Sequence, residues 1–474
     1  MSPGDGLDAV VVGSGPNGLA AALTLLRAGL SVEVFERAAT PGGGCRTEEL
    51  TLPGFHHDVC STVHPLLVAS AFFRDLDLPG VRMLASDVAY AHPLDGGRAV
   101  VMYNSFERTA AALGVDADRY RALIGPLLAN WRGVIDGALA PQRSIPAAPI
   151  TMAKFGLRAI WPAQMLVKLF RTDGARALLA GAAAHSIQPL DAPITAGFSI
   201  LFAILAHAVG WPVVEGGSQR VTDALVAAIE TAGGKVHTGS EIRAVGELPT
   251  RRATLLDTTP RGLLLLAGDR LPARAAARMR SFRYGPAIFK LDWALDGPVP
   301  WTAAECRRAP TVHVCGAYDE VMLTEAQVAA GRVPERPYCI VVQPSVVDAT
   351  RAPAGKQTLW GYCHVPSRCT VDMTDAIEAQ IERFAPGFRE LIIARASESP
   401  AQVEARNPNY VGGDINAGAA TARQTFFRPT ISWNQYKTGV DGLYLCSAST
   451  PPGGGVHGMC GVYAARAALH DLGV

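Results

Sequence analysis

The stretch DAVVVGSGPNGLAAALTLLRAGLSVEVFERAATPGGGCRT, residues 8–47, decides the fold of the chain. Its apolar run at residues 9–12 has the length and β-branched content of a buried parallel strand, and it leads into the hexamer GSGPNG at residues 13–18. In this GxGxxG pattern the first glycine allows a tight turn, the second a close approach to a pyrophosphate, and the third close packing of the next helix on the sheet. The stretch therefore predicts a βαβ unit that binds a dinucleotide.

The residues after the hexamer complete this unit. Residues 19–28 are rich in Ala and Leu and precede Gly29, so they predict a helix whose free N-terminal amides and positive dipole end face the phosphates. A second strand at residues 30–35 leads to Glu36, near the spacing of about 20 residues expected for the carboxylate that binds the ribose hydroxyls. The candidate cofactor-binding residues of this unit are Gly13, Gly15, Pro16, Asn17, Gly18, Glu36 and Arg37.

The glycine-rich segment PGGGCRT at residues 41–47 distinguishes flavin from nicotinamide. It resembles the GG motif that follows the second strand in the flavin amine oxidase and phytoene desaturase superfamily. This resemblance implies that a glycine backbone and a basic residue, here Arg46, approach the pyrophosphate and the ribityl chain of FAD. It adds Gly43, Gly44, Arg46 and Thr47 to the expected cofactor-binding residues.

Composition excludes several classes of partner. A chain of 474 residues predicts two or three domains of about 100 to 200 residues each. The net charge of +1 and the charged fraction of 18% do not indicate a nucleic-acid binder, so we expect a small, apolar partner. Nine cysteines without a CxxC pair, and a first strand that leaves no room for a signal peptide, predict a cytoplasmic protein.

The region 79–211 is rich in alanine and interrupted by prolines, and it predicts a helical substrate or cap region. Its most apolar parts, residues 177–184 and 196–211, are shorter than the roughly 18 to 20 residues that span a bilayer. Three interpretations remain open: a buried core helix, a wall of an apolar substrate tunnel, or a patch that contacts a membrane surface. The histidines His56, His57 and His64 lack the i, i+4 spacing of helical metal ligands, so no metal site is expected.

Segments in the middle of the chain extend the resemblance. WPVVEGGS at residues 211–218 looks like the signature where the chain returns to the FAD-binding domain, and the strand and turn after residue 235 would place the backbone amide of Ile242 at the adenine. From 271 to 404 the pattern predicts strands that form the floor of a substrate cavity, with one clear helix at 374–384. His364 and Cys363 lie on such a strand and either face the flavin or pack in the core.

The C-terminal block is the second strong signal. Residues 407–429 resemble the GGD segment of the superfamily and contain Asp414. A strand at 442–447 precedes the glycine-rich loop PPGGG at 451–455 and a helix predicted at 456–470. Amides at the start of such a helix stabilise the negative charge of a reduced flavin. This block adds Ser447, Gly454, Gly455, Val456 and His457 to the expected cofactor-binding residues, and the candidates for catalysis are His457, Asp414 and His364.

The order of these features resembles the phytoene-desaturase-like branch of the FAD-dependent amine oxidase superfamily over nearly the whole chain. The resemblance implies an α/β fold, with a Rossmann-type FAD-binding domain made of residues 1–75, 212–270 and 405–474. A mixed α+β substrate-binding domain, residues 76–211 and 271–404, is inserted into it.

The implied activity is hydride transfer between flavin N5 and a hydrophobic substrate such as an isoprenoid or a polyene. Apart from GGGVHG in the C-terminal loop, residues 453–458, no second GxGxxG is present, and neither is a CxxxxC pair, so electrons are expected to pass to an acceptor such as oxygen or a quinone. Two alternatives stay open. One is a flavin amine oxidase, for which an aromatic cage would come from Trp360, Tyr362, Trp433, Tyr436 and Tyr444. The other is a flavin-binding scaffold without turnover.

Overall fold

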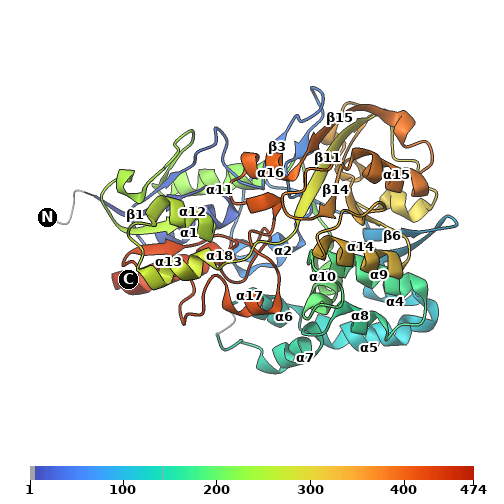
Figure 1. The fold of residues 1–474 in the computed structure, drawn as a ribbon, viewed down its shortest axis with the longest axis horizontal. Helices are drawn as coiled ribbons and strands as arrows, with labels where there is room; N and C mark the ends of the chain where they lie inside the picture. The colour runs from blue at the N-terminus through green and yellow to red at the C-terminus, as the bar shows by residue number, and fades with distance from the viewer. Residues whose placement is uncertain (1–5, 142–143) are drawn as a thin grey trace.

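A computed structural model describes residues 6–141 and 144–474. It contains two large sheets toward opposite ends of the long axis of the molecule (Figure 1). The first sheet is parallel throughout and has the strand order β16-β10-β1-β2-β9. Its strands are β1 (Leu7–Val12), β2 (Val32–Phe35), β9 (Lys235–His237), β10 (Arg251–Leu256) and β16 (Leu443–Leu445). All five strands lie in the ranges predicted for the FAD-binding domain.

Both faces of this sheet are covered, which explains why β1 is apolar at consecutive positions. Ala9 and Val11 pack against one set of helices, and Val10 and Val12 pack against the other. The first set is α1 (Pro16–Arg27), α11 (Gln219–Thr231) and α18 (Met459–Leu472). The second is α12 (Pro260–Ala267) and α13 (Ala273–Arg280). The predicted α/β fold with a Rossmann-type unit is thus confirmed.

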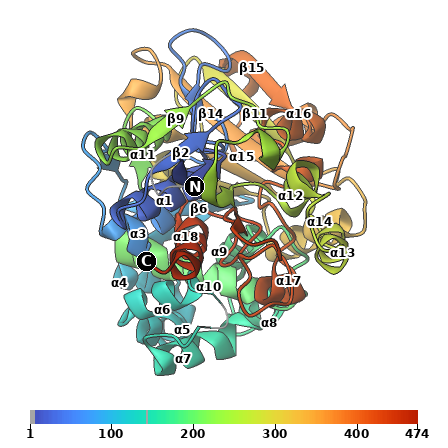
Figure 2. The same ribbon diagram turned by 90° about the vertical axis from the view of Figure 1, so that its left-hand side faces the viewer.

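The two ends of the chain meet in this domain, where α1 and α18 lie side by side (Figure 2). A β-carbon at Gly461 of α18 would lie only 1.9 Å from the carbonyl oxygen of Asn17. The helices therefore touch backbone to backbone, which only glycine permits. The first and last motifs of the sequence become neighbours through this contact.

The second sheet has the order β15-β11-β14-β13-β12-β6-β7 and is antiparallel except for the pair β12 and β6. Its strands are β6 (Val88–Leu94), β7 (Arg98–Tyr103), β11 (Ala287–Leu295), β12 (Thr311–Val314), β13 (Cys339–Val342), β14 (Gln357–Val365) and β15 (Ile392–Glu398). Short two-residue strands form two small sheets: β3 (Thr47–Glu48) with β4 (His57–Asp58), and β5 (Met83–Leu84) with β8 (Val213–Val214).

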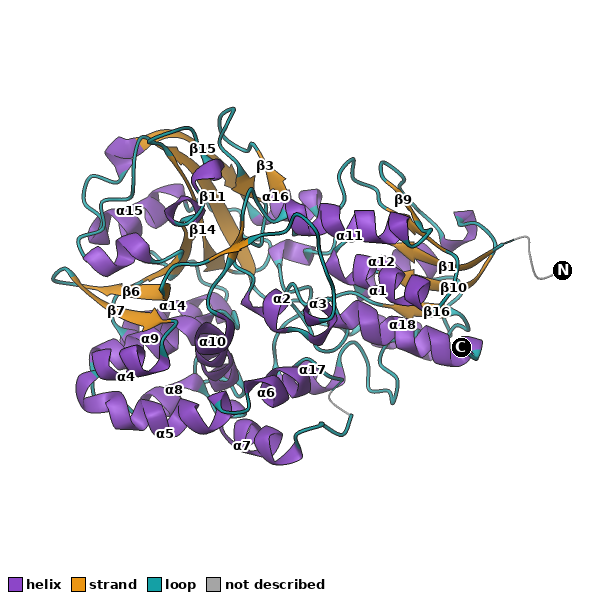
Figure 3. Ribbon diagram, turned by 180° about the vertical axis from the view of Figure 1, so that it is seen from behind, coloured by secondary structure: helices purple, strands orange, loops and turns teal. Residues whose placement is uncertain are grey.

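Helices cover this sheet and extend it into a helical lobe, seen from behind in Figure 3. The lobe contains α4 (Phe106–Ala112), α5 (Ala117–Leu128), α6 (Trp131–Ala138), α7 (Pro149–Ala159), α8 (Ala163–Val167), α9 (Asp173–Ala184) and α10 (Thr195–Val209). The remaining helices are α2 (Pro65–Ala69), α3 (Ala71–Arg74), α14 (Tyr318–Ala329), α15 (Thr374–Phe384), α16 (Pro400–Arg406) and α17 (Ala422–Phe427). The predicted helix at 374–384 is confirmed as α15.

Some predicted elements are wrong. Region 79–211 is not helical throughout, because β6 and β7 form a hairpin whose turn contains Gly96 and Gly97, both with positive φ. Between 271 and 404, α13, α14 and α16 accompany the one helix that was predicted. The last helix begins at Met459, three residues later than predicted, because Gly458 adopts a left-handed conformation at its N-cap.

The apolar segment at 196–211 forms α10, which packs in the core between α9 and α7 and contributes Phe202 to a cavity wall. The interpretation as core helix and cavity wall is therefore correct for this segment. In the ranges that the structure describes, no helix has both the length and the apolar composition that a bilayer crossing requires.

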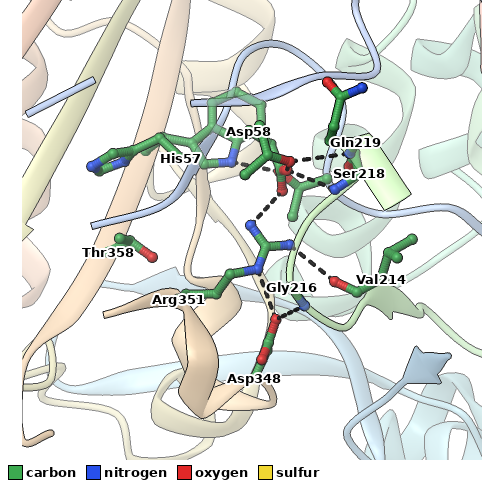
Figure 4. Close-up of polar contacts among 12 residues, drawn as sticks. His57, Asp58, Val214, Gly216, Ser218, Gln219, Asp348, Arg351 and Thr358 are labelled. Atoms are coloured by element: carbon green, nitrogen blue, oxygen red, sulfur yellow. Dashed lines mark hydrogen bonds and ion pairs between the residues drawn. The ribbon is translucent and has the colours of Figure 1, made fainter. Parts of the chain in front are cut away.

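A fully buried ion network links the small β3–β4 and β5–β8 sheets to the 348–351 segment (Figure 4). The guanidinium of Arg351 lies 2.9 Å from a carboxylate oxygen of Asp58 and 2.7 Å from one of Asp348, and it donates a third bond to the carbonyl of Val214. Asp58 also accepts hydrogen bonds from the Ser218 amide and the Thr47 hydroxyl. Burial alone would raise the pKa of Asp58, but the charge of Arg351 and these hydrogen bonds hold it below its usual value.

Replacing Arg351 by methionine should destabilise the protein by about 3 to 5 kcal/mol, because two buried carboxylates would lose their countercharge. Thermal or urea unfolding measures the change. Arg82→Met is the matched control, since Arg82 pairs with Glu215 next to the same segment but is exposed, and such pairs contribute less than about 1 kcal/mol. Equal losses of stability in both variants would contradict a stabilising role for the buried ion network.

Candidate active site

A cavity of about 690 Å³ extends from the carboxyl ends of the parallel strands to the inner face of the second sheet. Most of the residues predicted to bind a cofactor line it: Gly13, Gly15, Pro16, Asn17, Glu36, Arg37, Gly43, Gly44, Arg46, Ile242, Ser447, Gly454, Gly455 and Val456. The structure thus brings motifs from both chain ends and from the middle to one cavity. Gly18, Thr47 and His457 do not reach its wall.

The nucleotide end of the cavity is a cradle made by backbone. Gly13 has φ of +99°, and a β-carbon at Gly18 would lie 2.1 Å from the Gly13 carbonyl oxygen, so Gly18 holds the turn closed from behind. A β-carbon at Gly43 would lie 3.2 Å from the α-carbon of Gly15. The 41–47 segment therefore rests directly on the GxGxxG turn, and space that side chains would fill is left for a pyrophosphate at the start of α1.

Glu36 follows β2 and is fixed at the rim of this cradle. One of its carboxylate oxygens accepts hydrogen bonds from the amide and the hydroxyl of Ser14, at 2.9 and 2.8 Å. The other accepts one from the amide of Ala38. A carboxylate held in this way can accept further hydrogen bonds from a pair of ribose hydroxyls.

Arg46 is buried in the cavity wall. Its Nε donates to the carbonyl of Gly43 at 3.0 Å, and Nη1 lies 3.6 Å from Glu48. The cation is therefore anchored to the backbone of the GG segment. Thr47 instead supports this segment from outside, because its hydroxyl donates to Asp58 and accepts from the amide of Gln219.

Asp257 is a site residue that the sequence motifs did not reveal. It follows β10, lines the cavity, and accepts a hydrogen bond from the Gly18 amide at 3.0 Å. Burial raises the pKa of its carboxyl to about 7, and the charge of Glu36 adds to this effect. A carboxyl that is close to half protonated at neutral pH thus lies inside an anion-binding cradle.

The three catalytic candidates lie behind the cavity wall. His457 bonds to the Gly453 carbonyl through Nε2 and accepts from the Met459 amide through Nδ1, and burial lowers its pKa to about 4, so it is neutral at pH 7. Asp414 accepts hydrogen bonds from the amides of Gly285, Asn416 and Gly418. His364 pairs with Glu325 at 2.7 Å. Their catalytic roles stay predictions, and the first two residues hold loops whose neighbours line the cavity.

The other end of the cavity is mainly apolar and aromatic. Strands β12, β13 and β14 contribute one wall, and α10 with the segment after it contributes the opposite one. The residues are Thr311, Ile340, Val342, Trp360, Tyr362, Phe202 and Trp211. The rings of Trp360 and Tyr362 stack with centroids 5.9 Å apart. Of the other aromatic-cage candidates, Tyr436 and Tyr444 lie in the core of the dinucleotide domain, and Trp433 is 87% exposed.

The charged groups of the cavity gather at its nucleotide end. Among the described lining residues the acids are Glu36, Glu241 and Asp257, and all three belong to the segments after β2, β9 and β10. The arginines of the wall are Arg37, Arg46, Arg243, Arg261 and Arg406. The sheet-side wall carries no formal charge in this part of the chain, so this end suits a neutral, apolar molecule.

Comparisons with known proteins agree with this geometry. A family model for NAD(P)-binding Rossmann-like domains matches residues 11–76. Over 98% of the chain, the sequence is 28% identical to pyridine nucleotide-disulfide oxidoreductase domain-containing protein 2 of Mus musculus, of which 94% is covered. It is 26% identical to the hydroxyneurosporene desaturase of Rhodobacter capsulatus, with 98% of each chain covered.

Solved structures share the fold. An oxidoreductase from Methanosarcina mazei matches with a TM-score of 0.66 at 19% identity, over 97% of this chain and 100% of the other. A putrescine oxidase bound to putrescine matches with a TM-score of 0.64 at 16% identity, over 99% of each chain.

The site and these relatives define the class: the chain is an oxidoreductase with a Rossmann-type dinucleotide-binding domain. Within that class it is similar to phytoene-desaturase-like proteins along nearly its whole length, so the resemblance predicted from its motifs is confirmed.

Asp257→Asn should change how stability depends on pH. The folded pKa of about 7 lies above the ordinary value of 3.8, so Asp257 stabilises the fold fully below pH 4 and loses that contribution as pH rises toward and through 7. The asparagine side chain does not titrate, so the variant keeps its stability as the pH rises. The melting temperature of the variant relative to that of the wild type should therefore increase between pH 5 and 8. The exposed Asp269→Asn is the control, and parallel curves for wild type and Asp257→Asn would show that the carboxyl titrates normally.

Proposed function

We propose that the chain is an FAD-dependent oxidoreductase that moves a hydride between an apolar substrate and flavin N5. The observation that carries the proposal is one cavity with two chemical halves, a charged backbone cradle and a neutral aromatic chamber. Its most direct support from relatives is the similarity to carotenoid desaturases. The electron acceptor would be a molecule such as oxygen or a quinone.

The cradle fits FAD in its chemistry. Glu36 and the backbone at Ile242 would hold the adenosine, and the start of α1 with Gly43 and Arg46 would hold the pyrophosphate. The loop at Gly454–Val456 would hold the flavin ring. When bound, FAD supplies the hydride-accepting or hydride-donating atom.

The protein's own contribution in this proposal is positioning and exclusion of water. Trp360 and Tyr362 offer a flat apolar surface, and Ile340 with Val342 continues it along the sheet. An apolar chain held against this wall would meet the cofactor in one orientation, which lowers the entropic part of the barrier. The surrounding side chains exclude water from the reacting atoms.

The amine oxidase alternative is less well supported by the chamber. An ammonium group needs a carboxylate or an aromatic cage, and the described residues that line the chamber contribute no carboxylate there. Trp360 and Tyr362 lie on one face of one strand, so they form a single wall. Phe202 and Trp211 also line the chamber, so aromatic rings are present, and the lack of a lining carboxylate there is what disfavours an ammonium group.

The test is anaerobic mixing of the flavin-loaded protein with an isoprenoid polyene in micelles and, separately, with a primary amine. Bleaching of the oxidised flavin by the polyene, or reoxidation of the reduced flavin by it, is expected. Reduction by the amine alone would support an amine oxidase. The absence of exchange with either, while FAD stays bound, would favour a scaffold without turnover.

A β-carbon at Gly455 should weaken FAD binding about tenfold or more. Gly455 has φ of +128°, and the added carbon would lie 2.9 Å from Leu66 Cδ1 and 3.1 Å from His457 Cδ2, so the loop must shift, at a cost of about 1 to 3 kcal/mol. The readout for Gly455→Ala is flavin content and affinity. Gly387→Ala is the matched control, since Gly387 has φ of +89° and open space around it; equal flavin binding by both variants would contradict the assignment of this loop.

We also propose that the helical lobe contacts an anionic membrane surface. Ile150 and Leu157 on α7, with Ile160, Met165 and Leu169 after it, are 47% to 72% exposed. Helix α7 lies at the lower edge of the molecule in Figure 1. Residues 137–172 contain three arginines and two lysines but no Asp or Glu, so this segment carries a net positive charge that suits an anionic surface.

Leu157→Glu should lower binding to vesicles that contain anionic lipid by roughly tenfold, because lost apolar burial adds to about 1 kcal/mol of charge repulsion. Co-sedimentation with anionic and with zwitterionic vesicles measures it. Leu323→Glu on α14, at a similarly exposed site, is the control. Equal binding of both variants, or binding by neutral vesicles alone, would contradict this surface.

A further inference from the structure

One face of the second sheet carries buried polar side chains that the proposed chemistry leaves unused. His92 on β6, His313 on β12 and His364 on β14 are each at most 2% exposed. His313 shares its strand face with Thr311, two residues away, and Thr311 lines the cavity. A polar row therefore begins where the apolar chamber ends.

His185, just after α9, connects this row to the cavity. Its Nε2 lies 2.9 Å from Nε2 of His313, its ring contacts Phe202 edge to face, and it lines the cavity. In the part of the chain that the structure describes, Nδ1 of His185 has no hydrogen-bond partner. This nitrogen is thus left for a molecule bound in the chamber. We call His185, His313 and Thr311 the histidine pole.

Next to the pole lie further polar atoms that the described residues do not satisfy. Nδ1 of His92, Nδ1 of His313 and the hydroxyl of Tyr90 are buried without a hydrogen bond there. Both Nδ1 atoms lie against Gly181 of α9, where a β-carbon would be 2.7 and 2.9 Å away from them. Buried polar groups are normally paired, so these unpaired atoms mark this part of the sheet face as polar in contrast to the apolar chamber beside it.

The electrostatics of the pole restrict that guest. Burial lowers the pKa of His185 to about 3 and that of His92 to about 4, and it holds the pKa of His313 well below its ordinary value, so the imidazoles are neutral at pH 7. None of the described arginines that line the cavity lies on β12, on α9 or in the segment that contains His185. A carboxylate or a phosphate would find no countercharge at the pole. The carboxylate on this sheet face, Glu325, is bonded to His364 and does not line the cavity, so among the described residues an ammonium would find no lining carboxylate at the pole.

The tautomers of the two histidines leave room for either kind of neutral oxygen. If Nε2 of His185 donates to His313, its Nδ1 accepts a hydrogen bond from a hydroxyl; if Nε2 accepts, Nδ1–H donates to a carbonyl. Thr311 accepts from the indole N–H of Trp211 and keeps its own proton to donate.

We infer that the histidine pole binds a hydroxyl or carbonyl oxygen at one end of an otherwise apolar substrate. This inference adds a substrate-binding group to the proposed function. It rests on that function only where it identifies the bound molecule as the substrate. The pole would fix how far the apolar chain enters and thereby which carbon meets the cofactor.

The test measures the affinity of short probes for the flavin-loaded protein: 1-octanol, 2-octanone, octane, octanoate and octylamine. Binding is followed by tryptophan fluorescence, because Trp211 and Trp360 line the cavity. His185→Phe should raise the dissociation constants of octanol and octanone roughly five- to tenfold, as expected for one hydrogen bond, and should leave that of octane unchanged. His185→Gln should recover part of the affinity.

His207→Phe on α10 is the matched control, because both of its ring nitrogens are already bonded, to Tyr120 and to the carbonyl of Asn104, and it does not line the cavity. His185→Leu replaces the phenylalanine variant if that variant does not fold. Unchanged octanol affinity, or a larger loss for octanoate or octylamine than for octanol, would overturn the inference. Failure of the proposed function would appear separately, as a wild-type protein that binds no flavin or exchanges no electrons.

Discussion

The whole arrangement depends on places where two backbones meet with no β-carbon between them. Gly18 lies against the carbonyl of Gly13, Gly461 against that of Asn17, and Gly43 against Gly15. Any side chain at these positions would separate α1, α18 and the 41–47 segment. Since these three segments build the nucleotide half of the cavity, the site is shaped by excluded volume before any side chain takes part.

This construction separates two kinds of binding within one cavity. Backbone amides, Arg46 and Glu36 meet at the end where charge is expected, while the sheet-side wall is neutral. In a medium of low dielectric, charges act over longer distances than in water. Because the charged groups lie at one end, an apolar molecule can bind at the other end without removing water from them. Asp257 is the exception, and burial raises its pKa, so the cradle disfavours its charged form.

Much of the nucleotide half was predictable, because a backbone that must approach a phosphate reveals itself in glycine spacing, and Glu36 follows from the length of a βαβ unit. The roles of Asp257 and His185 could not be predicted from the sequence, because their partners Gly18 and His313 lie 239 and 128 residues away along the chain. His457 was expected at the flavin because a helix was predicted from 456. The left-handed turn at Gly458 turns its imidazole back onto the loop. The hairpin of β6 and β7 was missed because the surrounding region is rich in alanine. The Gly96-Gly97 pair, which is typical of a hairpin turn, could have indicated it.

The buried Arg351 network has a consequence for recombination between relatives. Asp58 on β4 and Val214 on β8 lie in the ranges predicted for the FAD-binding domain, whereas Asp348 and Arg351 lie in the range predicted for the insertion. A chimera with crossovers near residues 76, 212, 271 and 405 would therefore inherit the guanidinium from one parent and two of its three partners from the other. Exchange of the substrate half among homologues is constrained by this shared ion network as well as by the shape of the cavity.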